Sequence, residues 1–232
     1  MKKDTAKALL RLSEEEYNVY ASEFSTTRPF FWKELEFIKE YVEQGASVLD
    51  VGCGNGRLLD VFENTEIEYT GIDFSKELIS IAQNERGTKG TFLHGSALAL
   101  PFDDNSFDTV FSIAVLHHIP SKEYRQRFVS EAYRVLKPGG ICVLTVWNTL
   151  QWKFAKTHFI HAMKKLCGLS DLDIGDMIIP FGKEKKQRYI HSLTKREIQN
   201  VFRNNKFSDI SVDEIKRKSG YANYIVVAKK NT

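Results

Sequence analysis

Three glycines occupy alternate positions, Gly52, Gly54 and Gly56, in the stretch VLDVGCGNGR, a pattern that indicates a ligand-binding loop. Because glycine has no side chain, the backbone at these positions lets a ligand approach closely. A phosphate-binding P-loop would end in Gly-Lys-Ser/Thr, and nothing after Gly56 supplies that ending, which argues against a nucleotide triphosphate. The glycine spacing also differs from the G-x-G-x-x-G of dinucleotide sites. The motif therefore predicts a ligand that lacks a pyrophosphate.

An acidic residue follows at the end of the next apolar run, where Asp73 closes the stretch EYTGID. A carboxylate in that place can accept hydrogen bonds from both hydroxyls of a ribose, as carboxylates do in nucleoside sites. The glycines and Asp73 together predict a nucleoside as the ligand.

The elements that must position these residues follow from the alternation of apolar runs with amphipathic stretches. Five predicted strands alternate with helices, and two more strands close the chain: SVLDVG, EYTGID, TFLHG, FDTVFSIAV, ICVLTVW, FSDISVDEI and NYIVVAKK. This alternation predicts an α/β fold with a doubly wound, mostly parallel sheet. In such a sheet the binding sites lie at the carboxyl ends of the strands.

Two helices are predicted before the first strand. One carries the capping-box spacing Ser13 to Glu16, and the other covers RPFFWKELEFIKEYVEQG, residues 28 to 45. The later helices are expected from about Asn55, from Ser75, up to VLKPGG, over residues 149 to 167, and from a second capping box, Thr194 to Glu197. Residues 168 to 188 are expected to form a loop.

Length and composition indicate one domain with additions, since 232 residues with 42% hydrophobic content can bury one sizeable core. Three cysteines without a CxxC pair imply neither a disulfide framework nor a zinc site, so we expect a reducing, cytoplasmic setting. No apolar run approaches the ~20 residues of a membrane span, so no membrane partner is expected. The expected parts of the single domain are a helical lid (1–45), a cofactor-binding core (46–147), a substrate-side insertion (148–193) and a closing helix with strands (194–232).

Charge is distributed unevenly along the chain. Residues 1–150 hold 16 Lys and Arg against 22 Asp and Glu, whereas residues 151–232 hold 17 against 8, so net charges of −6 and +9 make up the total of +3. A basic final third on an acidic body suggests a phosphate-rich partner, because phosphate contacts dominate nucleic-acid affinity. A solvated lysine-rich surface explains the same excess equally well.

The motifs VLDVGCGNG, GIDFS, GSALALPF, FDTVFSIAVLHHI and RVLKPGG, in this order, resemble the class I S-adenosylmethionine methyltransferases over residues 46 to 147. The resemblance implies a Rossmann-like sheet of seven strands with an antiparallel last strand, and S-adenosylmethionine as the cofactor. The cofactor-binding positions that it implies are Asp50, Gly52, Cys53, Gly54, Asn55, Gly56, Asp73, Phe74, Ser96, Ala97 and Ile113. Many members carry an acid at the position of Ser96.

The flanking stretches YNVYASEFSTTRPFFW, AVLHHI, VWN, IIPF, QRYIHSLTKREI and YANYIVVAKK resemble the tRNA wobble-uridine carboxymethyl methyltransferases over almost the whole chain. That family esterifies the carboxylate of 5-carboxymethyluridine. Three positions depart from its pattern, with Phe181 and Tyr224 where Trp is common and Ile190 where Tyr is. The resemblance implies tRNA as a partner and a small zinc-binding activator subunit as a candidate partner. The positive excess of the final third predicts that tRNA binds along residues 153 to 218.

By the same resemblance, Arg28, His117 and Arg188 match motif positions that could orient the substrate carboxylate or a nearby phosphate. A guanidinium fork pairs with either anion. A surface salt bridge for each arginine and a backbone-bonded histidine are the alternatives. His118 and His191 are expected to pack rather than to react or bind metal, and no metal site is expected. Two other functions remain open: methylation of a small molecule, such as a quinone precursor or a metabolite acid, and a cofactor-binding interaction module.

Overall fold

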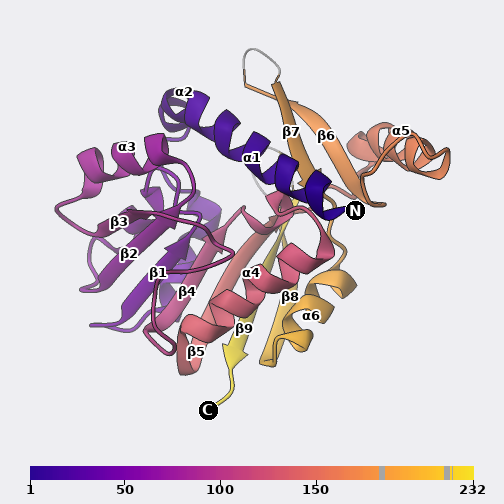
Figure 1. Ribbon diagram of the computed structural model, residues 1–232. Coiled ribbons are helices and arrows are strands. Elements are labelled where there is room, and N and C mark those ends of the chain that lie inside the picture. Colours follow the sequence, from indigo (N-terminus) through magenta and orange to yellow (C-terminus); the bar gives the residue numbers. More distant parts are fainter. Residues whose placement is uncertain (183–185, 217–219, 221) are drawn as a thin grey trace.

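The computed structural model describes residues 1–182, 186–216, 220 and 222–232. In these residues seven strands form one sheet in the order β3-β2-β1-β4-β5-β9-β8, and β9 runs antiparallel to both of its neighbours (Figure 1). The strands are β1 (Ser47–Val51), β2 (Glu68–Asp73), β3 (Thr91–His94), β4 (Phe107–Ile113), β5 (Leu136–Trp147), β8 (Phe207–Lys216) and β9 (Ala222–Lys230). The predicted fold class, including the antiparallel last strand, is confirmed.

The centre of this sheet is apolar on both faces, as a parallel sheet covered by helices requires. Val48, Leu49, Val143 and Leu144 are fully buried there. The chain winds outward from β1 to β3 and then returns to β4 beside β1, so the strand order reverses between β1 and β4. A doubly wound sheet binds its ligand outside the carboxyl ends of the strands at such a reversal.

Three helices cover the sheet: α3 (Lys76–Arg86), α4 (Lys122–Val135) and α6 (Lys195–Asn204). The first and the last of them begin where the sequence predicted a helix start. The predicted capping residue Thr194 accepts a hydrogen bond from the Glu197 amide at 3.1 Å, which confirms that helix start. The strand after α4 begins earlier than predicted, because Leu136 already pairs with Phe107 and a register shift follows before Ile141.

The N-terminal segment differs from its prediction at both helices. Helix α1 runs from Lys3 to Val19 and α2 from Ala21 to Thr27, so Ser13 and Glu16 lie inside α1 rather than at its start. The preceding TAKALLRL is rich in strong helix formers, which carry the helix through the capping pattern. The predicted helix from 28 to 45 is a 3-10 helix, η1 (Lys33–Tyr41).

Two local causes account for η1. Arg28 precedes a proline, which disfavours helical backbone, and it ends α2 with φ −137° and ψ 57°. The buried side chains Leu35 and Ile38 are three residues apart, a spacing that a 3-10 helix places on one side. The helix expected from about Asn55 is likewise a short 3-10 helix, η2 (Arg57–Phe62).

The segment predicted as a loop contains a hairpin, so that prediction was wrong. Strands β6 (Asp176–Phe181) and β7 (Lys186–His191) pair antiparallel, with Asp176 opposite His191 and Ile179 opposite Arg188. Met177 and Ile190 are fully buried, and their burial stabilises the pair against the body. The prediction missed the strands because Pro180 and the lysine-rich stretch from 183 to 186 obscure the alternation of each short strand.

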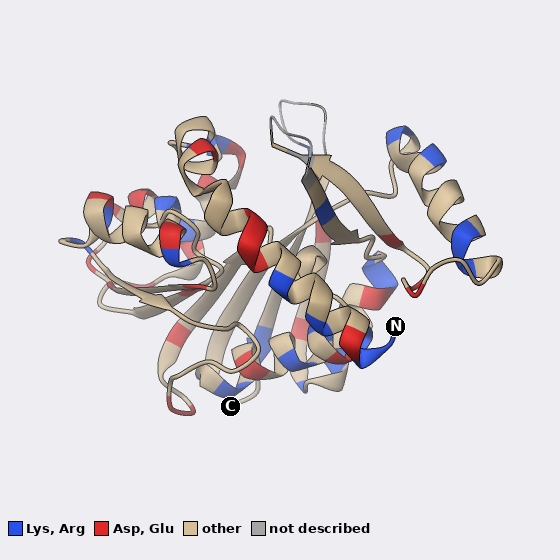
Figure 2. Cartoon of the chain, turned by 45° about the horizontal axis from the view of Figure 1, so that its top comes forward, with Lys and Arg blue, Asp and Glu red and all other residues tan. Residues whose placement is uncertain are grey.

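The helix predicted within 149–167 is confirmed as η4 (Trp152–Phe154) followed by α5 (Ala155–Leu166), which lies beside β6 (Figure 1). None of the α5 side chains is buried. Residues 149–170 contain no acidic residue, and the charged residues that Figure 2 shows on α5 are all basic. In the part of the chain that the structure describes, no helix is long and apolar enough to cross a membrane.

Candidate active site

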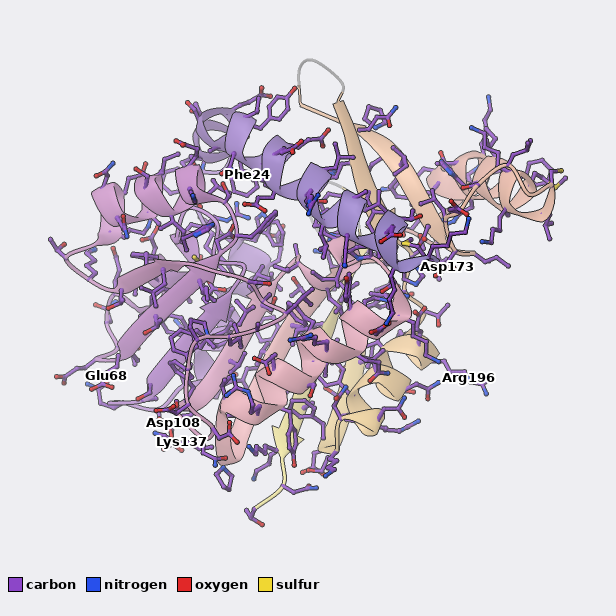
Figure 3. The ribbon with its side chains drawn as sticks, viewed as in Figure 1. Phe24, Glu68, Asp108, Lys137, Asp173 and Arg196 are labelled. Carbon is purple, nitrogen blue, oxygen red and sulfur yellow. The ribbon has the colours of Figure 1, made fainter. Side chains whose placement is uncertain are left out.

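A cavity of about 350 Å³ opens at the carboxyl ends of the parallel strands, beneath α1 and α2. Figure 3 labels Glu68, Asp108 and Lys137 at the other end of the sheet, and Phe24 on α2 at the cavity end. The predicted residues that line the cavity are Arg28, Gly52, Gly54, Asp73, Phe74, Ser96, Ala97, Ile113 and Arg188. The reversal of strand order thus lies directly under the N-terminal helices.

The glycine loop after β1 needs glycine for conformational and steric reasons. Gly52 and Gly56 have φ of +78° and +76°, which L side chains rarely adopt. A Cβ at Gly52 would lie 2.4 Å from the Val115 side chain, and one at Gly56 would lie 2.6 Å from Phe92. Gly52 borders the cavity, whereas Gly56 is packed behind it.

Asp73, at the end of β2, ties this loop to the next helix. Its Oδ2 accepts a hydrogen bond from the Gly54 amide at 2.9 Å, and its Oδ1 accepts one from the Ser75 amide at 2.8 Å. Burial raises the pKa of Asp73 to about 6, although these amides favour the charged form. Each carboxylate oxygen keeps a further lone pair, so Asp73 can also accept from ligand hydroxyls at the cavity wall.

Other positions of the motif lie behind the cavity wall rather than in it. Asp50 accepts a hydrogen bond from the Tyr69 hydroxyl at 2.7 Å, and burial raises its pKa to about 7. Cys53 is buried, and burial raises the pKa of its thiol well above the usual range, so it is not a reactive thiolate. Asn55 donates from Nδ2 to the Arg28 carbonyl at 3.4 Å. None of these three side chains lines the cavity, and their hydrogen bonds and burial support the loop from behind.

His118, which was expected to pack, lines the cavity, whereas His117, which was expected to face the substrate, does not. His117 is fully buried, does not line the cavity, and stacks on Trp147 with ring centroids 4.8 Å apart. His118 lines the cavity; its Nδ1 faces the Tyr189 carbonyl at 3.1 Å, so Nδ1 carries the proton and Nε2 accepts from the Tyr17 hydroxyl at 3.3 Å.

Neither histidine is a cation at neutral pH. Burial, joined by repulsion from nearby charge, lowers the pKa of His117 well below its usual value and that of His118 to about 3. His117 therefore cannot attract a carboxylate by its charge. The turn at Leu116–His118, a 3-10 helix named η3, places the second histidine of the pair at the cavity.

The two predicted arginines reach the same cavity from different segments. Arg188 comes from β7, and its Cζ lies 4.7 Å from the Trp147 ring centroid. Arg28 comes from the end of α2, where its Cζ lies 4.6 Å from the Phe24 ring centroid and its Nη1 donates to Thr27 Oγ1 at 2.8 Å. Aromatic faces pack against both guanidinium groups at the cavity.

Several residues of the cavity escaped the sequence analysis. Arg57 lines it and stacks 5.0 Å from the Trp32 ring centroid. Tyr17 on α1 contacts the Phe74 and His118 rings at 5.7 Å and 5.9 Å. A cation directly after the third glycine was the available signal for Arg57, whereas nothing in the sequence places Tyr17 over a strand end.

Solved structures share this architecture. A SAM-dependent methyltransferase of Methanosarcina mazei matches with a TM-score of 0.72 at 24% identity, covering 87% of this chain and 99% of that one. A Burkholderia thailandensis 1,6-didemethyltoxoflavin-N1-methyltransferase with bound S-adenosylhomocysteine matches with 0.68 at 17%, covering 100% and 92%. A Haloferax volcanii complex of the Trm112 methyltransferase activator with a methyltransferase described as putative matches with 0.68 at 18%, covering 94% and 97%. The chain therefore has the class I methyltransferase fold.

Sequence comparison defines the core more narrowly. Residues 49–144 match the family model described as methyltransferase domain, in agreement with the predicted cofactor-binding core. S-adenosylmethionine, the predicted cofactor, is the methyl donor of this class. A relative in Arabidopsis thaliana, tRNA (carboxymethyluridine(34)-5-O)-methyltransferase, is 36% identical over 135 residues, 58% of this chain and 32% of the relative. A Mus musculus protein of the same enzyme name is 37% identical over 150 residues, 64% and 22%. The chain spans a third or less of these relatives' lengths.

Proposed function

We propose that this protein transfers a methyl group from S-adenosylmethionine to the carboxylate of a carboxymethyl-type modified wobble uridine in tRNA. The observation that carries the proposal is the Arg188 guanidinium, held on Trp147 beside a neutral His118 in a cavity that also contains Asp73. This arrangement offers a place for an anion next to a place for a nucleoside.

The residues present fit the proposed cofactor. Asp73 would accept from the ribose hydroxyls, while Phe74 and Ala97 would form an apolar wall for adenine. The glycine loop and the nearby Arg28 would receive the methionine carboxylate, since Arg28 lies next to Phe24, the ring that Gly54 faces. S-Adenosylmethionine supplies an electrophilic methyl group on a sulfonium.

A carboxylate acceptor suits a cavity whose lining histidine, His118, is neutral. With a pKa near ~4, the acceptor is already ionised at neutral pH and needs no general base. The task left to the protein is orientation, and placing two reactants correctly accounts for a large part of such rate enhancements. The planar Arg188 guanidinium would donate a hydrogen bond to each oxygen of the acceptor carboxylate. Its contact with the Trp147 ring would fix the plane of the guanidinium.

Transfer RNA as the substrate is supported by the names of the relatives and by the basic final third. The α5 helix offers one described part of this basic surface, next to the hairpin that carries Arg188 (Figure 2). Lys183, Lys185 and Lys218, within the predicted tRNA-binding segment, lie outside the described residues. A tRNA substrate would place the protein in the cytoplasm, and the Haloferax volcanii neighbour suggests an activator subunit as a partner.

The second candidate is methylation of a small-molecule acid, such as a quinone precursor or a metabolite acid. A cavity of about 350 Å³ beneath α1 and α2 suits a small acceptor, and the Burkholderia thailandensis neighbour is described with a bound small molecule.

The test is methyl transfer by the purified chain, with and without an activator subunit, to tRNA that contains 5-carboxymethyluridine. An ester product returns to the acid in mild alkali, whereas an N- or C-methyl product is stable. Arg188→Lys should reduce turnover at least tenfold and leave cofactor affinity nearly unchanged, because a point charge cannot fix a planar carboxylate through two bonds. Full activity of this variant, or an alkali-stable product, would contradict the proposal.

A further inference from the structure

A second cluster of charged side chains lies at the base of the β6–β7 hairpin, where Asp176, His191 and Arg125 are buried and the Glu197 side chain is 31% exposed. His191 lies between two carboxylates, with Nδ1 2.6 Å from Asp176 Oδ1 and Nε2 2.9 Å from Glu197 Oε1. Asp176 Oδ1 also accepts from the Tyr189 hydroxyl at 2.7 Å, and Glu197 Oε1 accepts from Arg125 Nη2 at 3.3 Å. The cluster joins β6, β7 and α6, which follow one another in the sequence, to the more distant α4.

The geometry fixes the charge of this histidine. Both ring nitrogens face carboxylate oxygens, which only accept hydrogen bonds, so His191 makes both bonds only as the imidazolium. The bonds to Asp176 and Glu197 raise the pKa of His191, against the opposing effect of burial. Two carboxylates, one imidazolium and one guanidinium leave the cluster with no net charge, which is the condition for burying so many ionised groups.

The cluster is linked to the cavity through strand β7. Tyr189 and His191 lie on one face of the strand, and Arg188 lies on the other. The Tyr189 side chain bonds to Asp176, while its backbone carbonyl accepts from His118 in the cavity. Arg188 is three residues from His191, about 10 Å along the strand. A shift at the base of the hairpin therefore displaces the guanidinium from its position over the Trp147 ring.

We infer that His191 is a positioning residue: as an imidazolium clasped by Asp176 and Glu197 it fixes β7, and it thereby holds Arg188 on Trp147 for the acceptor. Deprotonation of His191 leaves one ring nitrogen without a hydrogen to donate to the carboxylate that it faces. That hydrogen bond is then lost, and the hairpin is fixed less firmly. The consequence for the acceptor rests on the proposed function, whereas the consequence for Arg188 and Trp147 does not.

The groups around His191 determine the direction of the pH effect. They are Asp176 and Asp173 from β6 and the turn before it, Tyr189 from β7, Glu197 from α6, and Arg125 from α4. The N-terminal ammonium group bonds to Asp173 and adds a positive charge at the edge. Because the pKa of His191 is raised, its hydrogen bonds to both carboxylates persist at and below neutral pH. One of them is lost as the pH rises above the ordinary histidine range.

The first experiment needs no substrate. In a Trp32→Phe, Trp152→Phe background, Trp147 is the remaining tryptophan of the chain and reports on the Arg188 contact by its fluorescence. Titration from pH 5 to 9 should show an inflection above pH ~6.5. Glu197→Gln should move the midpoint to lower pH, because the imidazolium loses a negative neighbour, and His191→Gln should abolish the inflection. His161→Gln is the matched control, since His161 also contacts the hairpin, through the Ile178 amide, but stands outside the cluster.

The second experiment is a double-mutant cycle on kcat/KM for the tRNA acceptor. His191→Gln should lower this value about tenfold with cofactor affinity unchanged, and it should have no further effect in an Arg188→Ala background. Additive losses, or a midpoint of Trp147 fluorescence that Glu197→Gln leaves in place, would overturn the inference. If the wild-type chain methylates no tRNA, the proposed function fails. The Trp147 titration still decides whether protonated His191 holds Arg188 in place.

Discussion

Replacing Asp73 by Asn tests the nucleoside site with little change of shape. Both oxygens of Asp73 already accept backbone hydrogen bonds, from Gly54 at 2.9 Å and from Ser75 at 2.8 Å, and each would accept one more from a ribose hydroxyl. Hydrogen bonds to a charged group contribute about 1.5–3 kcal/mol each. The amide keeps one neutral acceptor, so we expect a loss of about 2–3 kcal/mol, or roughly 30- to 150-fold in cofactor affinity.

The same substitution should have little effect on folding. Burial raises the pKa of Asp73 from 3.8 to about 6, so the folded chain holds this proton more tightly than the unfolded chain. Stability is therefore lost as the pH rises from about 4 to about 6, by roughly 3 kcal/mol for two pKa units. The Asp73→Asn variant avoids this loss, but its new NH₂ group faces a backbone amide at a cost of about 1–3 kcal/mol. The two effects oppose each other, and Tm should change little.

Isothermal titration calorimetry with S-adenosylmethionine and S-adenosylhomocysteine at several pH values checks both parts. Wild-type affinity should rise as the pH increases through about 6, because the ionised Asp73 carboxylate is the better acceptor. The Asp73→Asn variant should bind weakly at every pH. Affinity within about twofold of wild type, in a variant with unchanged Tm, would refute the assigned ribose contact.

Three further outcomes are expected. Asp50→Asn should leave cofactor affinity within about twofold and make Tm at pH 8 higher than in the wild type, because its pKa of about 7 marks a carboxylate whose charge is costly to bury; calorimetry at pH 5 and pH 8 checks this. Gly56→Ala should lower the free energy of unfolding in urea by about 2–4 kcal/mol through φ strain and the Phe92 contact, whereas the matched Gly45→Ala, with a similar φ and open space, should cost about 1–2 kcal/mol. Removing the four positive charges of η4 and α5 should weaken tRNA binding and flatten the slope of log affinity against log salt by up to ~4, and an unchanged slope would move the RNA-binding face elsewhere. These charges are those of Lys153, Lys156, Lys164 and Lys165.

The sequence predicted the sheet well because its signals are local. Apolar runs such as Val48–Val51 and the glycines at positive φ constrain the chain within a few residues. Asp73 could be located for the same reason, since strand end and motif coincide. The hairpin that carries Arg188 escaped because short strands around Pro180 have little periodicity of their own, and their pairing depends on burial against the body.

The cavity side chains were predictable only where a strand end fixed them. His118 rather than His117 faces the cavity, because the 3-10 turn after β4 rotates the pair, and sequence spacing does not reveal that rotation. Tyr17 and Phe24 reach the cavity through the packing of α1 and α2 across the strand ends, a contact between segments far apart in sequence. The buried His191 cluster needs four elements together and has no local signature.

The central claim, that the acceptor is a carboxylate on a wobble uridine of tRNA, is tested most directly by mass spectrometry of nucleosides from bulk tRNA of the source cells, with and without the gene. The proposed function predicts that the methyl ester of 5-carboxymethyluridine disappears when the gene is removed, that the free acid accumulates, and that the wild-type gene restores the ester while an Arg188→Ala copy does not. An unchanged ester level in the cells without the gene would contradict the claim and leave a small-molecule acid as the acceptor to be sought.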